Sequence, residues 1–328
     1  MSDTNAPRIA VGSPKARHIL GFEPARFVAF VLFVAVVALA PMVVYPYFLM
    51  RVYCFIIFAL AYNLLLGFTG LMSFGHAAFF GMGGYLCGWA AREWGLPFEL
   101  AVLTGTVTAG LMGLVFGWIA IRRTGLYFAM ITLALAQMVY FVALQADFTG
   151  GENGMQRIPR GTLLGFFDLS DPTILYWTIG VLTLFSVYAV NRIVHSPFGQ
   201  VLRAIRENPV RAKSLGYNVD RYKLLSFTIS AALTGFAASL KAVIFGISTL
   251  SDIDVMTSTE VVLITLVGGI GTIFGSVVGA FLILSMEHFL APYGPWLLLV
   301  EGVVFMLFVL VFRRGIVGGL QDWLKRPL

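Results

Sequence analysis

Residues 101–144 read AVLTGTVTAGLMGLVFGWIAIRRTGLYFAMITLALAQMVYFVAL, two apolar stretches separated by Arg122 and Arg123. A helix rises about 1.5 Å per residue, so about twenty apolar residues are needed to cross the hydrocarbon core of a bilayer. Each stretch meets that length and contains no acidic or basic side chain. This part of the sequence therefore predicts two membrane-spanning helices that meet on the side where the arginines lie.

The rest of the chain has the same character. Of its 328 residues, 59% are hydrophobic and 12% are charged, against roughly 45–50% and 25% in a soluble domain. This composition excludes a secreted disulfide scaffold, a disordered protein and an ordinary soluble enzyme. We expect an all-α, polytopic membrane protein with about ten transmembrane helices, which correspond to ten apolar windows at 27–48, 52–69, 71–91, 98–121, 125–146, 173–192, 224–248, 259–271, 274–291 and 296–312.

Two Gly-rich segments interrupt these windows. The first is AYNLLLGFTGLMSFGHAAFFGMGGY at 61–85, and the second is VGGIGTIFGSVVGA at 267–280. Glycine can break or bend a membrane helix, and the freed backbone groups are tolerated only against protein or a water-filled cavity. We therefore expect broken helices there, and region 259–291 is either two short crossings or one broken helix.

The basic residues orient the chain, because lysine and arginine accumulate in cytoplasmic loops. With ten spans and both termini in the cytoplasm, nine of the sixteen acids lie outside, and 17 of the 22 basic residues lie inside. The inside set is Arg8, Lys15, Arg17, Arg26, Arg122, Arg123, Arg192, Arg203, Arg206, Arg211, Lys213, Arg221, Lys223, Arg313, Arg314, Lys325 and Arg326. The net charge of +6 is thus explained by membrane topology and not by nucleic-acid binding.

This topology divides the chain into five parts. A cytoplasmic tail covers 1–26, and spans one to six cover 27–192 with an outer loop at 146–172. A cytoplasmic coupling loop covers 193–223, spans seven to ten cover 224–312, and a basic cytoplasmic tail covers 313–328.

The inner loop contains HSPFGQVLRAIRENPVRAKSLGYNVDRYK at 195–223. Ser196-Pro197 and Asn208-Pro209 are both helix starts, with a capping side chain before a proline, and Gly216 permits a left-handed exit. The second helix is too short to be stable alone, so it requires a partner surface. The side chains that offer charge and hydrogen bonds to a soluble subunit are Arg203, Arg206, Glu207, Arg211 and Lys213; the alternative is that these cations only contact lipid head groups.

Five polar side chains in the apolar windows are candidates for lining a translocation path: Asn63, Ser73, His76, Thr132 and Gln137. The alternative is that they hydrogen-bond inside the helix bundle. Motifs for nucleotide binding, for metal binding and for a nucleophilic serine do not occur, and both cysteines lie in apolar windows. We therefore expect no catalytic residue, metal or cofactor in this chain, and any ATP would be bound by another chain.

Five ordered stretches carry a resemblance to a known family. They are SFGHAAFFGMGGY at 73–85, GLYFAMITLALAQ at 125–137, TGGENGM at 149–155, SPFGQVLRAIRENPVRAKSLGYNVDRYKLLSFTISA at 196–231 and TLVGGIGTIFGSVVGA at 265–280. The chain resembles the permease subunits of the branched-chain (hydrophobic) amino acid ABC importers over roughly 51–315. Closely similar permeases serve urea and short amides, and these motifs do not separate the substrates.

The resemblance implies a pore subunit of the bacterial inner membrane. Its partners would be a second homologous permease, two ATP-binding subunits, a periplasmic substrate-binding protein and membrane lipid, without nucleic acid. Residues 197–216 correspond to the family's coupling region, in which Glu207, Asn208 and Gly216 take part. A different class stays open, a self-sufficient secondary transporter or channel that uses the broken helices as its site.

Overall fold

The computed structural model describes residues 24–42, 44–163, 165–294, 299–300, 302–303, 305–306 and 315–324. Most of the predicted span 296–312 and of the predicted tail 1–26 lies outside these residues. Of the predicted C-terminal tail, residues 315–324 form a helix, α13 (Gly315–Leu324). The described part of the chain is mostly helical, and its strands are two residues long.

The boundary predicted between the first two apolar windows, at 49–51, lies inside a helix. Helices form in the apolar windows that the structure describes and also in the predicted coupling loop at 193–223. They are α1 (Pro24–Leu39), α2 (Pro46–Asn63), α3 (His76–Glu93), α4 (Phe98–Ala120), α5 (Leu126–Gln145), α6 (Pro172–His195), α7 (Pro197–Glu207), α8 (Pro209–Ser214), α9 (Val219–Phe245), α10 (Val255–Gly268) and α11 (Ile273–Leu290). Shorter turns are η1 (Ala40–Met42), η2 (Leu64–Thr69), η3 (Asp147–Thr149), η4 (Gly151–Asn153), η5 (Leu250–Asp252) and η6 (Ala291–Tyr293).

Six helical segments are long and apolar enough to cross a membrane: Pro46–Thr69, Phe98–Ala120, Leu126–Gln145, Pro172–His195, Val219–Phe245 and Ile273–Leu290. Two shorter apolar helices cover Val28–Met42 and Val255–Gly268. These segments confirm a polytopic, helical membrane protein. The number of about ten spans and the orientation of the termini stay predictions.

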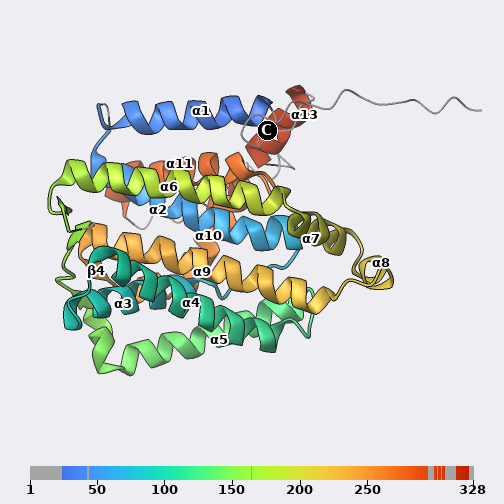
Figure 1. Cartoon of the computed structure of the whole chain (residues 1–328), viewed down its shortest axis with the longest axis horizontal. Helices are drawn as coiled ribbons and strands as arrows, with labels where there is room; N and C mark the ends of the chain where they lie inside the picture. Colours follow the sequence, from blue (N-terminus) through green and yellow to red (C-terminus); the bar gives the residue numbers. More distant parts are fainter. Residues whose placement is uncertain are drawn as a thin grey trace, which may run out of the picture.

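The helices run side by side (Figure 1). Buried α2 is central and packs against α6, α9, α10 and α11, while α3, α4 and α9 pack against one another. Small residues allow this close packing. A Cβ added to Gly105 of α4 would lie 2.4 Å from the carbonyl oxygen of Gly83 in α3, and one added to Gly83 would lie 2.6 Å from the Cα of Gly235 in α9.

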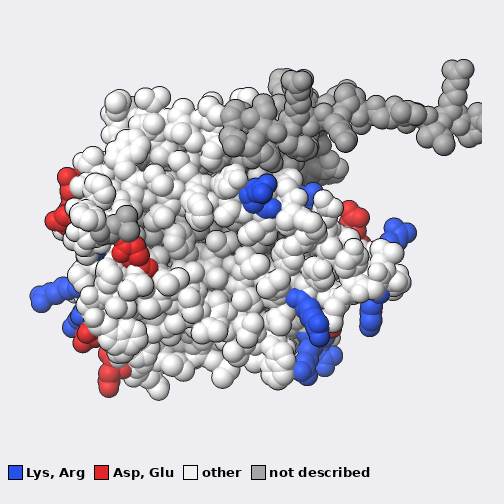
Figure 2. All heavy atoms as spheres, in the orientation of Figure 1, with Lys and Arg blue, Asp and Glu red and all other residues white. Residues whose placement is uncertain are grey.

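The two ends of the bundle differ in charge. What we call the acidic end holds segments 146–171 and 246–254, joined where β1 (Met155–Gln156) pairs antiparallel with β4 (Ile247–Ser248). Segment 146–171 also contains the hairpin of β2 (Thr162–Leu163) and β3 (Phe167–Asp168). The opposite end, the basic end, holds α7, α8 and the turn between α4 and α5, and most of the basic side chains visible in Figure 2 lie there.

Both Gly-rich segments are broken as predicted. After α2 the chain forms the π-helical turn η2, then takes a left-handed conformation at Gly70 with φ 78° before α3 begins. Region 259–291 is two helices, α10 and α11, joined by a tight turn at 269–272. With 14 residues, α10 is about 21 Å long and does not by itself cross a core of roughly 30 Å.

Candidate coupling region and translocation path

The loop between α6 and α9 folds into two capped helices. The Ser196 hydroxyl accepts a hydrogen bond from the Gly199 N–H at 3.4 Å and caps α7. The Asn208 side chain accepts one from the Arg211 N–H at 3.0 Å and caps α8. Gly216 leaves α8 with φ 89°. Both predicted helix starts and the predicted left-handed exit are present, because side-chain caps and prolines are local signals.

The helix α7 has a buried face and an exposed face. Leu202 and Ile205 are buried against the bundle. Ala212 of α8 is also buried, and the rest of α8 is exposed. The exposed tip carries Arg211 and Lys213 beside the apolar side chains of Val210 and Leu215, which are 77% and 68% exposed. Glu207 is exposed at the end of α7. A small surface of mixed charge and apolar character therefore faces away from the membrane helices.

Two arginines of α7 are exposed and also contact the bundle. Arg206 donates a hydrogen bond from Nη1 to the carbonyl oxygen of Gly67 in η2. The Arg203 guanidinium lies 5.4 Å from the ring centroid of Phe68, also in η2. The contact of both arginines with a soluble subunit stays a prediction, and each also lies against the broken end of the α2 segment. Carbonyl groups freed by a π-helical turn are natural acceptors for a cationic donor.

Asn63, at the end of α2, binds the turn between α10 and α11. Its Nδ2 donates to the carbonyl oxygen of Thr272 at 2.7 Å and to Ser276 Oγ at 3.2 Å. Its Oδ1 accepts from the Gly271 N–H at 2.8 Å. The side chain is buried, at 1% exposure. The Asn63 amide therefore fixes the second broken segment to the end of α2. This attachment is close to η2, which Arg206 contacts.

His76 lies at the start of α3 in an aromatic surrounding. Its Nε2 is 2.9 Å from Ser230 Oγ, and that hydroxyl donates to the carbonyl oxygen of Ala61 at 2.5 Å. The rings of Tyr62, Phe79 and Phe227 meet the imidazole edge to face at centroid distances of 5.1, 5.6 and 5.8 Å. Nδ1 is buried and has no hydrogen-bond partner among the described residues. His76 thus joins α3 to α2 and α9 within the core.

Ser73 and Thr132 hold the irregular stretch before α3. Ser73 Oγ accepts from the Gly75 N–H at 3.2 Å. Thr132 Oγ1 of α5 accepts from the Phe74 N–H at 3.2 Å and donates to the carbonyl oxygen of Ala129 at 2.9 Å. Gln137 is half-buried, and within the described part of the chain no hydrogen bond joins it to the other four candidates. The structure therefore brings four of the five path candidates to the two broken segments.

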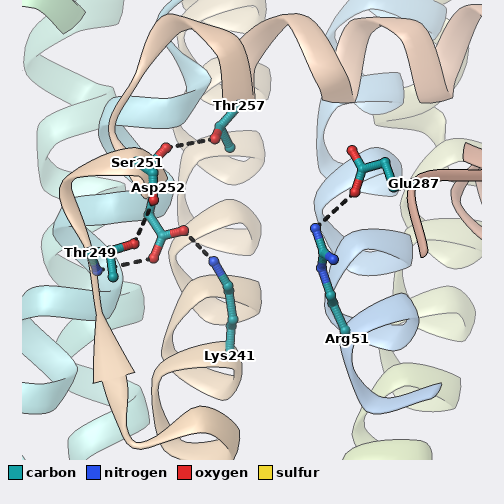
Figure 3. A network of polar contacts seen from close by, with 7 residues as sticks. All are labelled: Arg51, Lys241, Thr249, Ser251, Asp252, Thr257 and Glu287. Carbon is teal, nitrogen blue, oxygen red and sulfur yellow. Dashed lines mark hydrogen bonds and ion pairs between the residues drawn. The ribbon is translucent and has the colours of Figure 1, made fainter. Parts of the chain in front are cut away.

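Sequence reasoning missed a set of charged side chains near the acidic end. Arg51 of α2 pairs with Glu287 of α11 at 2.9 Å, and Lys241 of α9 pairs with Asp252 of η5 (Figure 3). Asp252 also accepts from the Thr249 N–H at 3.3 Å. The available signal was a single charge inside an apolar window, which Lys241 and Glu287 carry and which needs a partner at that depth, whereas Arg51 and Asp252 lie between windows. Local sequence does not identify the partner of Glu287, which the structure shows to be Arg51.

These two ion pairs show the course of the α10–α11 hairpin. Asp252 precedes α10 and Glu287 lies near the end of α11, so both outer ends of the hairpin are tied to neighbouring helices at the acidic end. The turn of the hairpin is tied to Asn63, on the side of α7. Glu260 of α10 lies close to Glu287, and its Oε1 is buried without a hydrogen-bond partner among the described residues.

Comparison with known proteins identifies the family of this chain. The family model for the branched-chain amino acid transport system permease component matches residues 44–312. The high-affinity branched-chain amino acid transport system permease protein LivM of Escherichia coli K12 is 28% identical over 294 residues, covering 83% of this chain and 69% of LivM.

More distant relatives share the same region. The high-affinity branched-chain amino acid transport system permease protein LivH of Escherichia coli K12 is 25% identical over 280 residues, covering 79% of this chain and 90% of LivH. The galactose/methyl galactoside import permease MglC of the same organism is 26% identical over 230 residues, covering 65% and 66%. No solved structure matches the chain. The chain belongs to the branched-chain amino acid transport permease family, whose members are membrane components of transporters.

Proposed function

We propose that this chain is the transmembrane pore subunit of an ATP-driven importer for branched-chain or other hydrophobic amino acids. The family supports this proposal. The observation that carries it is the position of α7, which leads to an exposed tip at the basic end while Arg203 and Arg206 contact η2. The tip, which we call the coupling surface, consists of Glu207, Val210, Arg211, Lys213 and Leu215. A helix that contacts η2 on one side and a partner chain on the other can pass a displacement from the partner into the bundle, which a surface loop cannot.

The coupling step follows from these contacts. ATP binding on partner chains shifts the population between two packings of the bundle, because each packing offers a different contact energy to the partner. Movement of α7 displaces Gly67 through the Arg206 hydrogen bond. Asn63, four residues before Gly67, then displaces the turn at 269–272. The α10–α11 hairpin is in this way the element that opens or closes the path.

The remaining parts of the importer come from other chains. We propose a second homologous permease, two ATP-binding subunits and a periplasmic binding protein that supplies most of the substrate selectivity. The chain itself lies in the bacterial inner membrane with both termini in the cytoplasm, carries no cofactor and makes no covalent bond with substrate. Membrane lipid surrounds its exposed apolar side chains.

The test is uptake by the complete complex in vesicles, with ATP hydrolysis measured in the same preparation. The double variant Arg203→Ala with Glu207→Ala is expected to retain membrane insertion and to lose uptake per ATP hydrolysed. Arg123→Ala is the matched control, because Arg123 is an exposed cation of the same end in the turn between α4 and α5. Unchanged uptake by the double variant contradicts the proposed coupling.

Two other functions give different results in the same system. A permease for urea or short amides takes up these solutes and is not inhibited by leucine. A self-sufficient secondary transporter or channel is favoured by Glu260, a carboxylate inside an apolar helix. Flux driven by an ion gradient through this chain alone, without ATP-binding subunits, would establish that second class.

A further inference from the structure

A groove of about 250 Å³ lies between the end of α4 and the start of α9, at the basic end. Trp118, Ile121 and Arg122 line it from α4 and the residues that follow. Asp220, Arg221 and Leu224 line it from the first turns of α9. The lining therefore combines apolar with charged side chains. It lies at the end of the apolar helix α4, where we expect the chain to leave the hydrocarbon core.

The charge of this groove favours an anionic ligand. Arg122 and Arg221 are both among the lining residues, and Asp220 is the one acidic residue among them. Neither arginine forms an ion pair with a described carboxylate. The Arg122 guanidinium lies 4.9 Å from the ring centroid of Trp118. Guanidinium groups of this kind bind phosphate oxygens through charge-assisted hydrogen bonds.

An exposed apolar stripe leads along α4 into the groove. Its side chains are spaced three or four residues apart and so lie on one face of the helix. They are Leu103, Val107, Leu111, Leu114 and Trp118, with exposures of 54%, 49%, 59%, 47% and 61%. In a helix that crosses a bilayer such a face suits acyl chains, and tryptophan is enriched at the level of the head groups.

The start of α9 meets α7 and the groove through different residues. Tyr222 stacks on Phe198 of α7 at a centroid distance of 5.8 Å and also meets Tyr217. The adjacent residues Asp220 and Arg221 line the groove with α4 instead. A ligand in the groove therefore approaches from the side of α4, where the apolar stripe lies, and not from the tip of α8.

We infer that this groove binds an anionic phospholipid of the leaflet at the basic end. Arg122 and Arg221 hold the headgroup phosphate, Trp118 lies at the glycerol level, and one acyl chain follows the apolar stripe of α4. A lipid site at the junction of α4 with α9 is separate from transport itself. The first turn of α9 also contacts α7, where Tyr222 stacks on Phe198.

The test uses the full chain in vesicles of phosphatidylcholine that contain a minor fraction of lipid brominated near the headgroup. Bromine quenches nearby tryptophan, and the difference between the wild type and Trp118→Phe isolates the emission of Trp118 from the other five tryptophans. Brominated phosphatidylglycerol is expected to quench Trp118 at a lower fraction than brominated phosphatidylcholine. The preference should fall roughly fivefold for each of Arg122→Gln and Arg221→Gln.

Controls separate this site from general attraction to a basic surface. Arg123→Gln removes an exposed cation that does not line the groove and should keep the preference. Added inorganic phosphate should not displace the lipid, because it lacks the acyl chain that the stripe binds. Equal quenching by both lipids, an equal loss in Arg123→Gln, or loss of quenching when the partner subunits assemble would each overturn the inference, the last by making the groove a protein interface.

Discussion

Asn63 and Thr272 are 209 residues apart in the sequence and are joined by a hydrogen bond of 2.7 Å from Nδ2 to the carbonyl oxygen. Because the same amide accepts from the Gly271 N–H, one side chain fixes the turn between α10 and α11. The hairpin would otherwise have no polar attachment to the end of α2 among the hydrogen bonds of the described residues. This amide therefore joins the two broken segments into one unit.

Replacing Asn63 by alanine is expected to destabilise the protein. The Gly271 N–H and the Thr272 carbonyl lose their buried partner, which costs about 1–3 kcal/mol for an unsatisfied group. Denaturant unfolding in micelles measures the change. Thr178→Ala is the control, because the Thr178 hydroxyl bonds only to Ile174 of its own helix, and it should remain within about 0.5 kcal/mol of the wild type. Equal stability of both variants would contradict the role of Asn63.

Close packing of α4 predicts that alanine substitutions at two glycines of this helix differ in their effect on stability. A Cβ at Gly105 would lie 2.4 Å from the Gly83 carbonyl oxygen, whereas a Cβ at Gly110 would lie 3.3 Å from its nearest neighbour, Ala232. Gly105→Ala should therefore cost about 1–3 kcal/mol of stability through overpacking, and Gly110→Ala should be nearly neutral. Thermal unfolding of the two variants in detergent compares them directly, and the reverse ranking would refute the packing of α4 against α3.

The ion pair between Arg51 and Glu287 should stabilise the protein only when the two positions carry opposite charges. Its side chains are 36% and 16% exposed, so breaking it with Arg51→Gln should cost about 1–2 kcal/mol, between an exposed and a fully buried pair. The exchange Arg51→Glu with Glu287→Arg should recover much of the loss. The exposed pair of Arg92 and Glu93 is the control, and Arg92→Gln should have no measurable effect. An exchange variant as unstable as its single variants would argue against a specific pair.

The two sides of the coupling loop should have separable effects on transport. Arg206→Ala removes a charged hydrogen bond to Gly67, worth about 1.5–3 kcal/mol, so uptake per ATP hydrolysed should fall more than about fivefold while the complex still assembles. Arg211→Ala at the exposed tip should instead weaken assembly with the ATP-binding subunits. Uptake and co-purification, measured on the same vesicles, distinguish them. Identical behaviour of both variants would mean that α7 does not transmit movement to η2.

Much of the architecture could be predicted from local sequence. Apolar length gives the long helices, and the Ser196-Pro197 and Asn208-Pro209 pairs give α7 and α8, because capping and proline geometry act within one turn. The glycines of 61–85 and 267–280 predicted broken helices for the same reason. The composition of the spans also determined that the solvent around them is lipid.

Only the tertiary structure decided which polar side chains meet. Arg206 and Gly67 are 139 residues apart, and Arg51 and Glu287 are 236 residues apart. No periodicity of the chain encodes such pairs, since they depend on how helices from distant segments pack. Hydrophobicity determines each membrane helix separately, because it depends only on the residues of that segment. The contacts of Asn63, Arg206 and Arg51 depend on the packing of several helices, because polar groups inside the bilayer need partners on neighbouring segments.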